Sequence, residues 1–242
     1  MCVPSYTHGH HESVLRSHLW RTVENSAAYL EPHLEPGMAL LDVGCGPGNL
    51  TVDLARRVAP GRVVGIDNVY SIVQRAQADA PLDAHQVLQH VNDPVAALRE
   101  MRRVCRPGGV VAARDADYAA MAWHPADDRL EWWLALYGTI ARGNGGEPDA
   151  GRHLLQWADE AGFADVEQSA SVWRFDTPSD RSWWGSLWAD RVRDSALADQ
   201  AIERDLASRS DLKEIATAWL EWVDHPEGWF TVSHYEIIGR IP

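Results

Sequence analysis

A chain of 242 residues is long enough for one α/β domain with further helices over a binding site. Its 45% hydrophobic and 24% charged residues form an ordinary globular balance, which excludes a disordered protein. The net charge of −13 repels phosphate backbones and anionic lipid surfaces, so neither nucleic acid nor a membrane is an expected partner.

The first predicted helix spans Glu12–His33, where apolar residues recur at helical spacing and Pro32 ends the pattern. It follows a group of histidines: His8, His10 and His11. Their one acidic neighbour is Glu12, which makes a poor metal site, so a flexible or lid segment without a metal is expected. The segment has no apolar leader and the three cysteines fit a reducing compartment, which predicts a cytoplasmic protein.

A strand–helix–strand unit comes next. A short apolar strand at Met38–Val43 leads into a glycine-rich turn, Gly44–Gly48, and then into a helix from about Asn49 to Val58. A second buried strand, Arg62–Ile66, ends at Asp67. Because successive parallel strands are joined by a right-handed crossover, these two strands should lie side by side in one sheet.

The rest of the chain alternates between helices and strands. Helices are predicted near Ser71–Ala80 and at Pro94–Cys105, and a buried strand at Val110–Ala113. The later predicted elements are two helices, a strand, a long helical stretch and a closing strand: Asp127–Arg142, Asp149–Ala161, Val166–Phe175, Ser179 to about Asp224, and Trp229–Ile241.

The Gly44–Gly48 turn is the main functional signal. A strand that turns sharply into a helix points backbone N–H groups and a helix dipole at the space above it, and glycines let a ligand approach closely. The spacing is G-x-G-x-G, with Asp42 two residues before the first glycine. Asp67 ends the next strand, at the sequence separation from the glycine turn that is typical of a ribose-binding carboxylate. This predicts a nucleoside-bearing cofactor, and Asp67 alone fits a nicotinamide dinucleotide equally well.

Three stretches together resemble class I S-adenosylmethionine-dependent methyltransferases. Leu41–Asn49 resembles their motif I, and Val63–Asp67 resembles their second strand. Arg99–Val111, with its Pro-Gly-Gly turn, resembles the helix, turn and fifth strand of the same fold. The resemblance is closest to the ubiquinone/menaquinone-biosynthesis type and to bacterial natural-product methyltransferases.

The resemblance implies an α/β fold with a Rossmann-like seven-stranded sheet, an N-terminal lid helix and a helical cap inserted before the last strand. We expect a single domain over residues 1–242, with the cofactor-binding core at 34–115 and the helices and cap at 116–228. The expected cofactor is S-adenosyl-L-methionine. The residues expected to bind it are Asp42, Gly44, Cys45, Gly46, Gly48, Asp67, Asn68, His85, Gln86 and Arg21. For Arg21, a surface ion pair is an open alternative to the cofactor carboxylate.

One departure from the family pattern stands out. The family has a third strand, a helix and a fourth strand between the positions of Asp67 and His85, and here they are nearly absent. Without the central fourth strand, the sheet would have open edges and unpaired backbone groups. We therefore expect that a few tens of residues are absent near positions 80–84, together with the usual adenine-contacting acidic residue.

The predicted catalytic residues follow the expected fourth and fifth strands, where open α/β sheets hold their ligands. His90 is a candidate base or orienting group, although local packing is an alternative. Asp115 and Tyr118 are further catalytic candidates, and Asp117 is a candidate for holding the acceptor. For the aspartates, ordinary turn chemistry is equally compatible.

Tryptophan is unusually frequent, with 12 Trp against 3 Phe, and only Trp20 precedes position 120. Trp either fills the core of the C-terminal half or lines an aromatic pocket. On the second interpretation Trp184, Trp188 and Arg191 bind a small aromatic or heteroaromatic acceptor.

The sequence leaves open whether the methyl group is transferred to carbon, nitrogen or oxygen. It also leaves open whether the protein is a monomer or a homodimer. Two other classes also remain possible from the sequence: a nicotinamide-dependent oxidoreductase and a non-catalytic cofactor-binding protein.

Overall fold

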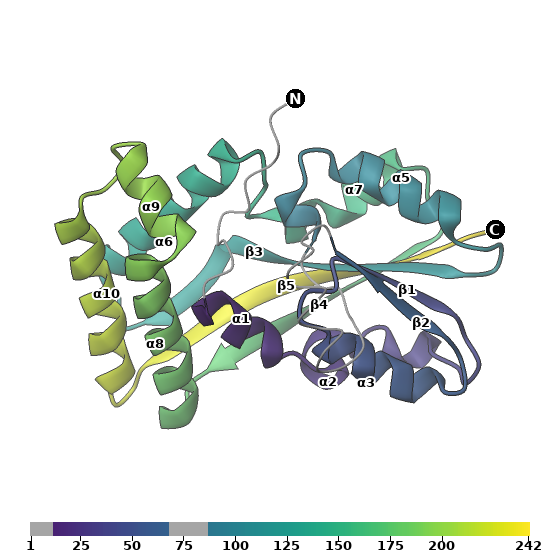
Figure 1. Cartoon of the computed structure of the whole chain (residues 1–242), viewed down its shortest axis with the longest axis horizontal. Coiled ribbons are helices and arrows are strands. Elements are labelled where there is room, and N and C mark those ends of the chain that lie inside the picture. Colours follow the sequence, from purple (N-terminus) through teal and green to yellow (C-terminus); the bar gives the residue numbers. More distant parts are fainter. Residues whose placement is uncertain (1–11, 68–86) are drawn as a thin grey trace.

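The computed structural model describes residues 12–67 and 87–242 (Figure 1). It begins with three short helical pieces: α1 (Glu12–Leu19), α2 (Val23–Ser26) and η1 (Glu31–His33). The prediction of one continuous helix here was wrong, because the side chain of Thr22 accepts a hydrogen bond from the backbone of Asn25 and caps a new helix. Residues 12–26 are called the N-terminal strap below.

The predicted strand–helix–strand unit is confirmed. It consists of β1 (Leu40–Val43), α3 (Asn49–Val58) and β2 (Val63–Ile66). The two strands run parallel, with Leu40 opposite Val63 and Val43 opposite Ile66. Leu50 and Leu54 of α3 pack against Val23 of the strap, so the strap lies on this unit.

A second sheet has three strands: β3 (Val110–His124), β4 (Val166–Phe175) and β5 (Trp229–Arg240). Their order is β3–β5–β4, with β5 antiparallel to both neighbours. The strands predicted at Val166–Phe175 and Trp229–Ile241 are confirmed. β3 continues well past its predicted end at Ala113, because buried polar residues from Arg114 onward remain paired with β5.

The two sheets are not hydrogen-bonded to each other within the described ranges. These ranges contain five strands, so the expected seven-stranded sheet is not present in them. After β2, the next described element is the 3-10 helix η2 (Leu88–His90). The predicted core boundary at residue 115 also falls inside β3.

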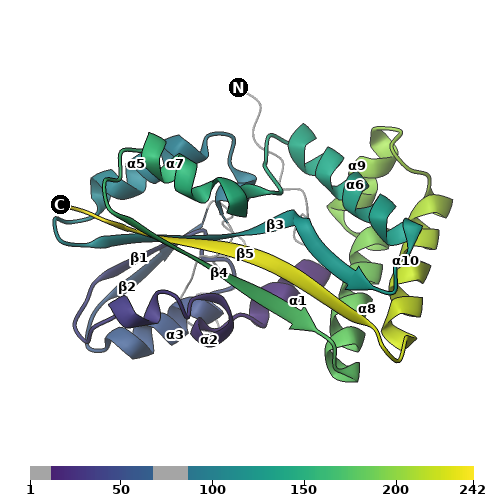
Figure 2. The same cartoon turned by 180° about the vertical axis from the view of Figure 1, so that it is seen from behind.

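Helices cover the three-stranded sheet on the side away from β1 and β2 (Figures 1 and 2). They are α5 (Pro94–Val104), η3 (Ala150–His153) and α7 (Leu154–Glu160). Leu98 of α5, Ala158 of α7 and Ile237 of β5 share one buried cluster. The helix predicted at Asp149–Ala161 therefore begins as a 3-10 turn and continues as α7.

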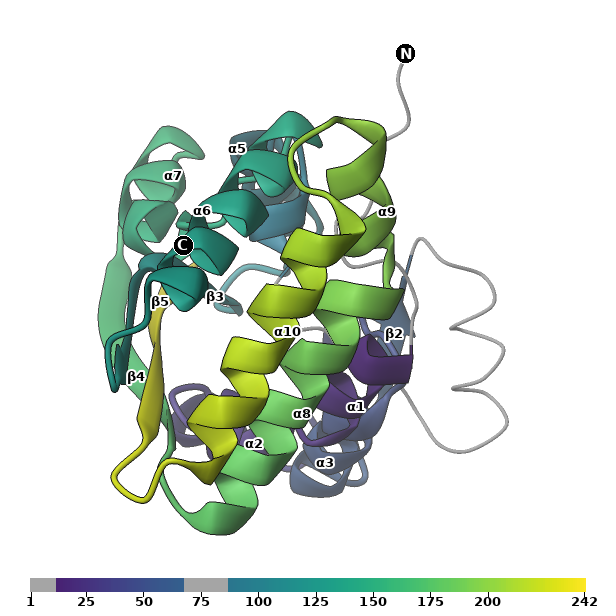
Figure 3. The ribbon, with the colours of Figure 1, turned by 90° about the vertical axis from the view of Figure 1, so that its left-hand side faces the viewer.

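The remaining helices gather at one end of this sheet (Figure 3). They are α6 (Asp128–Gly143), α8 (Pro178–Asp194), α9 (Ala196–Glu203) and α10 (Arg209–Asp224). The long helical stretch predicted from Ser179 to Asp224 divides into three helices, because Ser195 and Ser208 each cap a new one. Trp133, Trp188 and Trp219 are fully buried between these helices and the sheet.

In the described part of the chain, no helix is both long and apolar enough to cross a membrane. The same residues contain no cluster of histidine, cysteine, aspartate and glutamate side chains suited to a metal ion.

Candidate functional site

The turn after β1 has the backbone geometry that its glycines allow. Gly44, Gly46 and Gly48 have φ values of 76°, 54° and 93°, which side chains with a Cβ rarely adopt. The N–H groups of Gly44 and Cys45 donate to the carbonyl oxygen of Ile66, at 2.6 and 3.0 Å. These bonds fix the turn to the end of β2, and α3 begins directly after Gly48.

The two predicted acidic residues lie on either side of this turn. The N–H of Gly46 donates to Oδ2 of Asp67 at 3.0 Å, so this carboxylate lies against the turn. Asp42 is buried, and its Oδ2 accepts a hydrogen bond from the hydroxyl of Thr51 in α3 at 2.6 Å. Asp67 is thus placed at the surface of the turn, while Asp42 ties β1 to α3.

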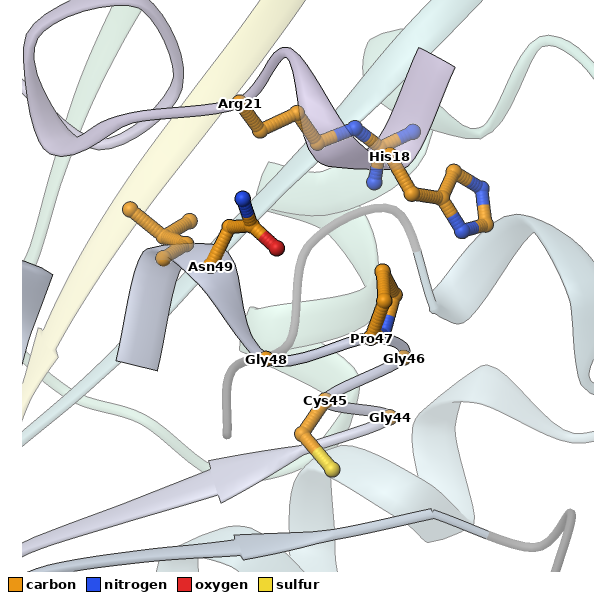
Figure 4. Close-up of a pocket in the computed structure, with 9 residues that line it drawn as sticks. His18, Arg21, Gly44, Cys45, Gly46, Pro47, Gly48 and Asn49 are labelled. Carbon is orange, nitrogen blue, oxygen red and sulfur yellow. The ribbon is translucent and has the colours of Figure 1, made fainter. Parts of the chain in front are cut away.

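A small cavity, partly open to solvent, lies over the turn. Figure 4 shows the turn on one side of it and His18 and Arg21 of the strap on the other. The cavity is lined by His18, Arg21, Gly44, Cys45, Gly46, Pro47, Gly48, Asn49 and Leu50. The structure therefore brings predicted Arg21 to the predicted glycine turn. His18 was not among the predicted site residues, and only its place on the strap next to Arg21 pointed to it.

The strap is held over the cavity from two directions. Asn49 of α3 donates to the carbonyl oxygen of Leu19 at 3.2 Å, and the N–H of Val23 donates to Asp53 of α3 at 2.8 Å. On the other side, Arg191 of α8 donates to the strap at 3.1 Å, both to the carbonyl oxygen of Ser13 and to the hydroxyl of Ser17. The strap thus links the glycine turn to the helices at the end of the sheet.

Asp115 of β3 and His90 of η2 are connected through Gln89. The N–H of Gln89 donates to Oδ1 of Asp115 at 3.3 Å, and Nε2 of Gln89 lies 3.0 Å from Nε2 of His90. Burial raises the pKa of Asp115 to about 7, although hydrogen bonds from the η2 backbone and the charge of Arg21 oppose this. Burial and the charge of Arg21 lower the pKa of His90 to about 3.

Tyr118 is the third predicted catalytic residue, and it is buried nearby. Its ring stacks on that of Tyr137 with the centroids 4.3 Å apart. Burial raises the pKa of Tyr118, while a hydrogen bond with Tyr137 and the charges of Arg191 and Arg21 act in the opposite direction. Arg21 therefore acts electrostatically on His90, Asp115 and Tyr118 as well as lining the cavity.

Comparison with known families gives this arrangement its context. A family model described as a methyltransferase domain matches residues 15–168, which include the strap, the glycine turn, η2 and β3. The chain belongs to this methyltransferase family. The family match decides against the nicotinamide-dependent alternative.

Whole-chain relatives agree with this assignment. An uncharacterized methyltransferase of Schizosaccharomyces pombe is 29% identical over 269 aligned positions, which cover 97% of this chain and 96% of the relative. A probable methyltransferase of Aspergillus luteorubrus is 24% identical over 276 positions, with the same two coverages. Because both alignments are longer than 242 residues, both relatives contain residues that this chain lacks. The protein is a class I S-adenosylmethionine-dependent methyltransferase.

A solved structure supports the fold of the methyltransferase. A putative methyltransferase from an antibiotic biosynthesis pathway of Anabaena variabilis superposes with a TM-score of 0.55 at 13% identity, covering 86% of this chain and 94% of that one. This likeness identifies the Rossmann-like α/β fold. The residues over the turn fit S-adenosylmethionine, because glycines with positive φ and a guanidinium group line this cavity, and the carboxylate of Asp67 lies against the turn.

Other predicted site residues of the methyltransferase lie elsewhere. Asp117 binds Arg152 through two hydrogen bonds of 2.6 and 2.8 Å, and its buried carboxylate is thereby occupied. Trp184 and Trp188 are buried among aromatic rings, as in the core-filling interpretation. The guanidinium group of Arg191 lies 4.5 Å from the ring centroid of Trp188 and binds the strap. These contacts give the four residues structural roles and do not support direct contact with an acceptor.

Several predicted residues lie outside the described ranges: His8, His10, His11, Asn68, His85 and Gln86. The helix predicted near Ser71–Ala80 and the expected missing segment near positions 80–84 also fall there. For these positions the sequence-based predictions stay predictions.

Proposed function

We propose that this methyltransferase transfers the methyl group of S-adenosylmethionine to a small-molecule acceptor held between the strap and β3. The observation that carries the proposal is the cavity bounded by the Gly44–Gly48 turn and by His18 and Arg21, with the carboxylate of Asp67 against the turn. The relatives that span the whole chain, although their acceptors are not named, support a methyltransferase of this size.

Each predicted cofactor residue has a physical role in this proposal. The backbone of the turn allows close approach of the cofactor, and Asp67 accepts hydrogen bonds from its ribose hydroxyls. Arg21 pairs with its carboxylate, for which a guanidinium group is well suited. Asp42 acts indirectly, because its carboxylate accepts a hydrogen bond from the hydroxyl of Thr51.

On the acceptor side, Asp115 is the proposed proton acceptor. A base works best when its pKa lies near the working pH, and the pKa of Asp115 is raised to about 7. His90, with its pKa lowered to about 3, stays neutral and orients the acceptor by hydrogen bonding. Tyr118 supplies a hydroxyl donor next to them. The acceptor is proposed to be a small aromatic or heteroaromatic metabolite, methylated at carbon, nitrogen or oxygen.

The larger architecture is also part of the proposal. The strap acts as the N-terminal lid, and α6, α8, α9 and α10 form the cap. The complete sheet is proposed to have seven strands, and the residues that this chain lacks are proposed to belong between β2 and η2. A single domain over 1–242, a cytoplasmic location and a monomer or homodimer remain predictions from the sequence.

The test is a calorimetric titration of the purified chain with S-adenosylhomocysteine, beside NADH, for the wild type and Asp67→Ala. We expect binding of S-adenosylhomocysteine in the micromolar range, about −8 kcal/mol, and its loss in the variant. Asp159→Ala, at an exposed position of α7, is the matched control and should bind like the wild type. Binding of NADH alone, or full affinity in Asp67→Ala, would contradict the proposed cofactor site.

A further inference from the structure

Trp173 lies where the outer strand β4 meets the N-terminal strap. Its indole N–H donates a 2.6 Å hydrogen bond to the carbonyl oxygen of Asn25, a residue 148 positions earlier in the chain. Its ring meets the ring of Trp20 edge-on, with the centroids 5.1 Å apart. Trp173 is itself buried, so these contacts attach the strap firmly to the sheet.

Two guanidinium groups lie within cation–π distance of this ring. Cζ of Arg114 is 4.9 Å and Cζ of Arg21 is 5.9 Å from a ring centroid of Trp173. Arg114 is fixed by a buried ion pair with Glu236, with 3.1 Å between Nε and Oε1. His234 of β5 packs on the same indole at 4.3 Å. The indole therefore has a fixed position from which it attracts the guanidinium group of Arg21.

Arg21 is the member of this group that reaches the cavity, whereas Trp173 is not among the lining residues (Figure 4). We propose that Trp173 is a positioning residue for cofactor binding, which holds Arg21 over the cavity opposite the Gly44–Gly48 turn. This inference rests on the proposed function, which pairs Arg21 with the carboxylate of S-adenosylmethionine. Trp173 acts through Arg21, so removal of its ring should affect the part of the ligand that carries the carboxylate.

Two ligands separate this role from a merely structural one. S-adenosylhomocysteine carries the amino-acid carboxylate, and 5′-methylthioadenosine shares its nucleoside but has no carboxylate. Both are titrated calorimetrically into the wild type, Trp173→Leu, Trp173→Phe and Arg21→Ala. Trp123→Leu is the matched control, because this half-buried tryptophan stacks on Phe230 of the same sheet away from the strap.

We expect Trp173→Leu to weaken S-adenosylhomocysteine about tenfold and to affect 5′-methylthioadenosine much less, since the guanidinium group that the ring orients pairs with the carboxylate, which 5′-methylthioadenosine lacks. Trp173→Phe keeps an aromatic face and should recover most of the affinity. In an Arg21→Ala background, Trp173→Leu should have little further effect, because the group that it positions is gone. Trp123→Leu should bind both ligands like the wild type.

Equal weakening of both ligands by Trp173→Leu and Trp173→Phe would overturn the proposal, because it would indicate general disruption. If Arg21→Ala weakens S-adenosylhomocysteine but Trp173→Leu does not, the positioning role fails and the proposed function stands. If Arg21→Ala leaves S-adenosylhomocysteine affinity unchanged, the assignment of Arg21 in the proposed function fails, and the role of Trp173 fails with it.

Discussion

Asp115 and His90 show how one buried environment shifts two neighbouring side chains in opposite directions. Burial opposes charge, which raises the pKa of the aspartate to about 7 and lowers that of the histidine to about 3. Both groups are therefore uncharged in mildly acidic solution. Near neutral pH, Asp115 is the group that exchanges a proton, which is why it suits the proposed role of base better than His90.

These shifts make stability depend on pH in a defined direction. Between about pH 4 and 7, folded Asp115 keeps a proton that the unfolded chain releases, so its contribution to the free energy of unfolding falls as pH rises. Between about pH 3 and 6.5, the unfolded chain protonates His90 and the folded chain does not, so this contribution rises with pH. The two contributions oppose each other in the wild type.

Asp115→Asn isolates the first of them. The amide does not titrate, and the His90 contribution is the same in both proteins and cancels. The difference in free energy of unfolding, wild type minus variant, should therefore fall by about 2–4 kcal/mol between pH 4.5 and pH 8. Urea unfolding at several pH values measures this difference. Asp159→Asn, an exposed substitution on α7, is the control for replacing a carboxylate by an amide. A constant difference for Asp115→Asn would mean that this carboxyl group titrates normally.

Sequence reasoning at this scale placed residues correctly where their position depends on local spacing. The glycine turn and the position of Asp67 follow from a few neighbouring residues and the next strand. Asp117 shows the limit, because its partner Arg152 comes from a later segment that sequence spacing does not bring to it. Likewise, nothing in the sequence around Trp173 indicates that its indole contacts the strap.

At the scale of elements, the link from β1 to α3 depends on glycines with positive φ. At Gly44 (φ 76°) a Cβ would lie 2.5 Å from Cγ2 of Val87, whereas at Gly37 (φ 89°) it would meet nothing within 4 Å. At both positions a residue with a Cβ would be strained, but the two positions differ in their surroundings. They therefore form a matched pair for testing the turn.

We expect Gly37→Ala to lower the free energy of unfolding by about 1–2 kcal/mol and to keep full affinity for S-adenosylhomocysteine. Gly44→Ala should be less stable still and should lose at least about tenfold in affinity, since Val87 must move and the turn with it. Denaturant unfolding and calorimetry measure both quantities. Equal affinity in the two variants would argue against cofactor binding at the turn.

Element boundaries were predictable where a regular hydrophobic pattern ends at turn residues or at a cap. α3, α5, β4 and β5 match their predicted ranges closely, and among them α5 has a side-chain cap, Asp93. β3 was predicted too short because Arg114, Asp115 and Asp117 interrupt its apolar pattern. Tertiary partners satisfy these buried charges, and a single sequence does not reveal such partners.

At the scale of the whole molecule, the two sheets differ in how many buried apolar contacts stabilise them. β1 and β2 form a short parallel pair on which Leu41 and Ile66 are 50% and 46% exposed. The β3–β5–β4 sheet is longer and packs against a large aromatic core. Local stability follows buried apolar contacts, so opening of the smaller pair should need less free energy.

Hydrogen exchange followed by mass spectrometry tests this difference. Peptides from β1 and β2 should exchange faster than those from β3 and β5, and S-adenosylhomocysteine should slow exchange mainly around the glycine turn and the strap. Equal protection of both sheets without ligand would indicate a single cooperative unit. Protection by ligand confined to the helices at the far end of the sheet would contradict the proposed site.

The attachment of the strap on both sides also has a consequence for turnover. In the proposed function the cofactor binds beneath His18 and Arg21, and the strap is tied to α3 by Asn49 and Asp53. We therefore expect opening of these ties to assist departure of the demethylated product and to limit the rate of turnover. In a rapid-mixing experiment such an enzyme gives a burst of methylated product in the first turnover, followed by a slower steady state set by strap opening.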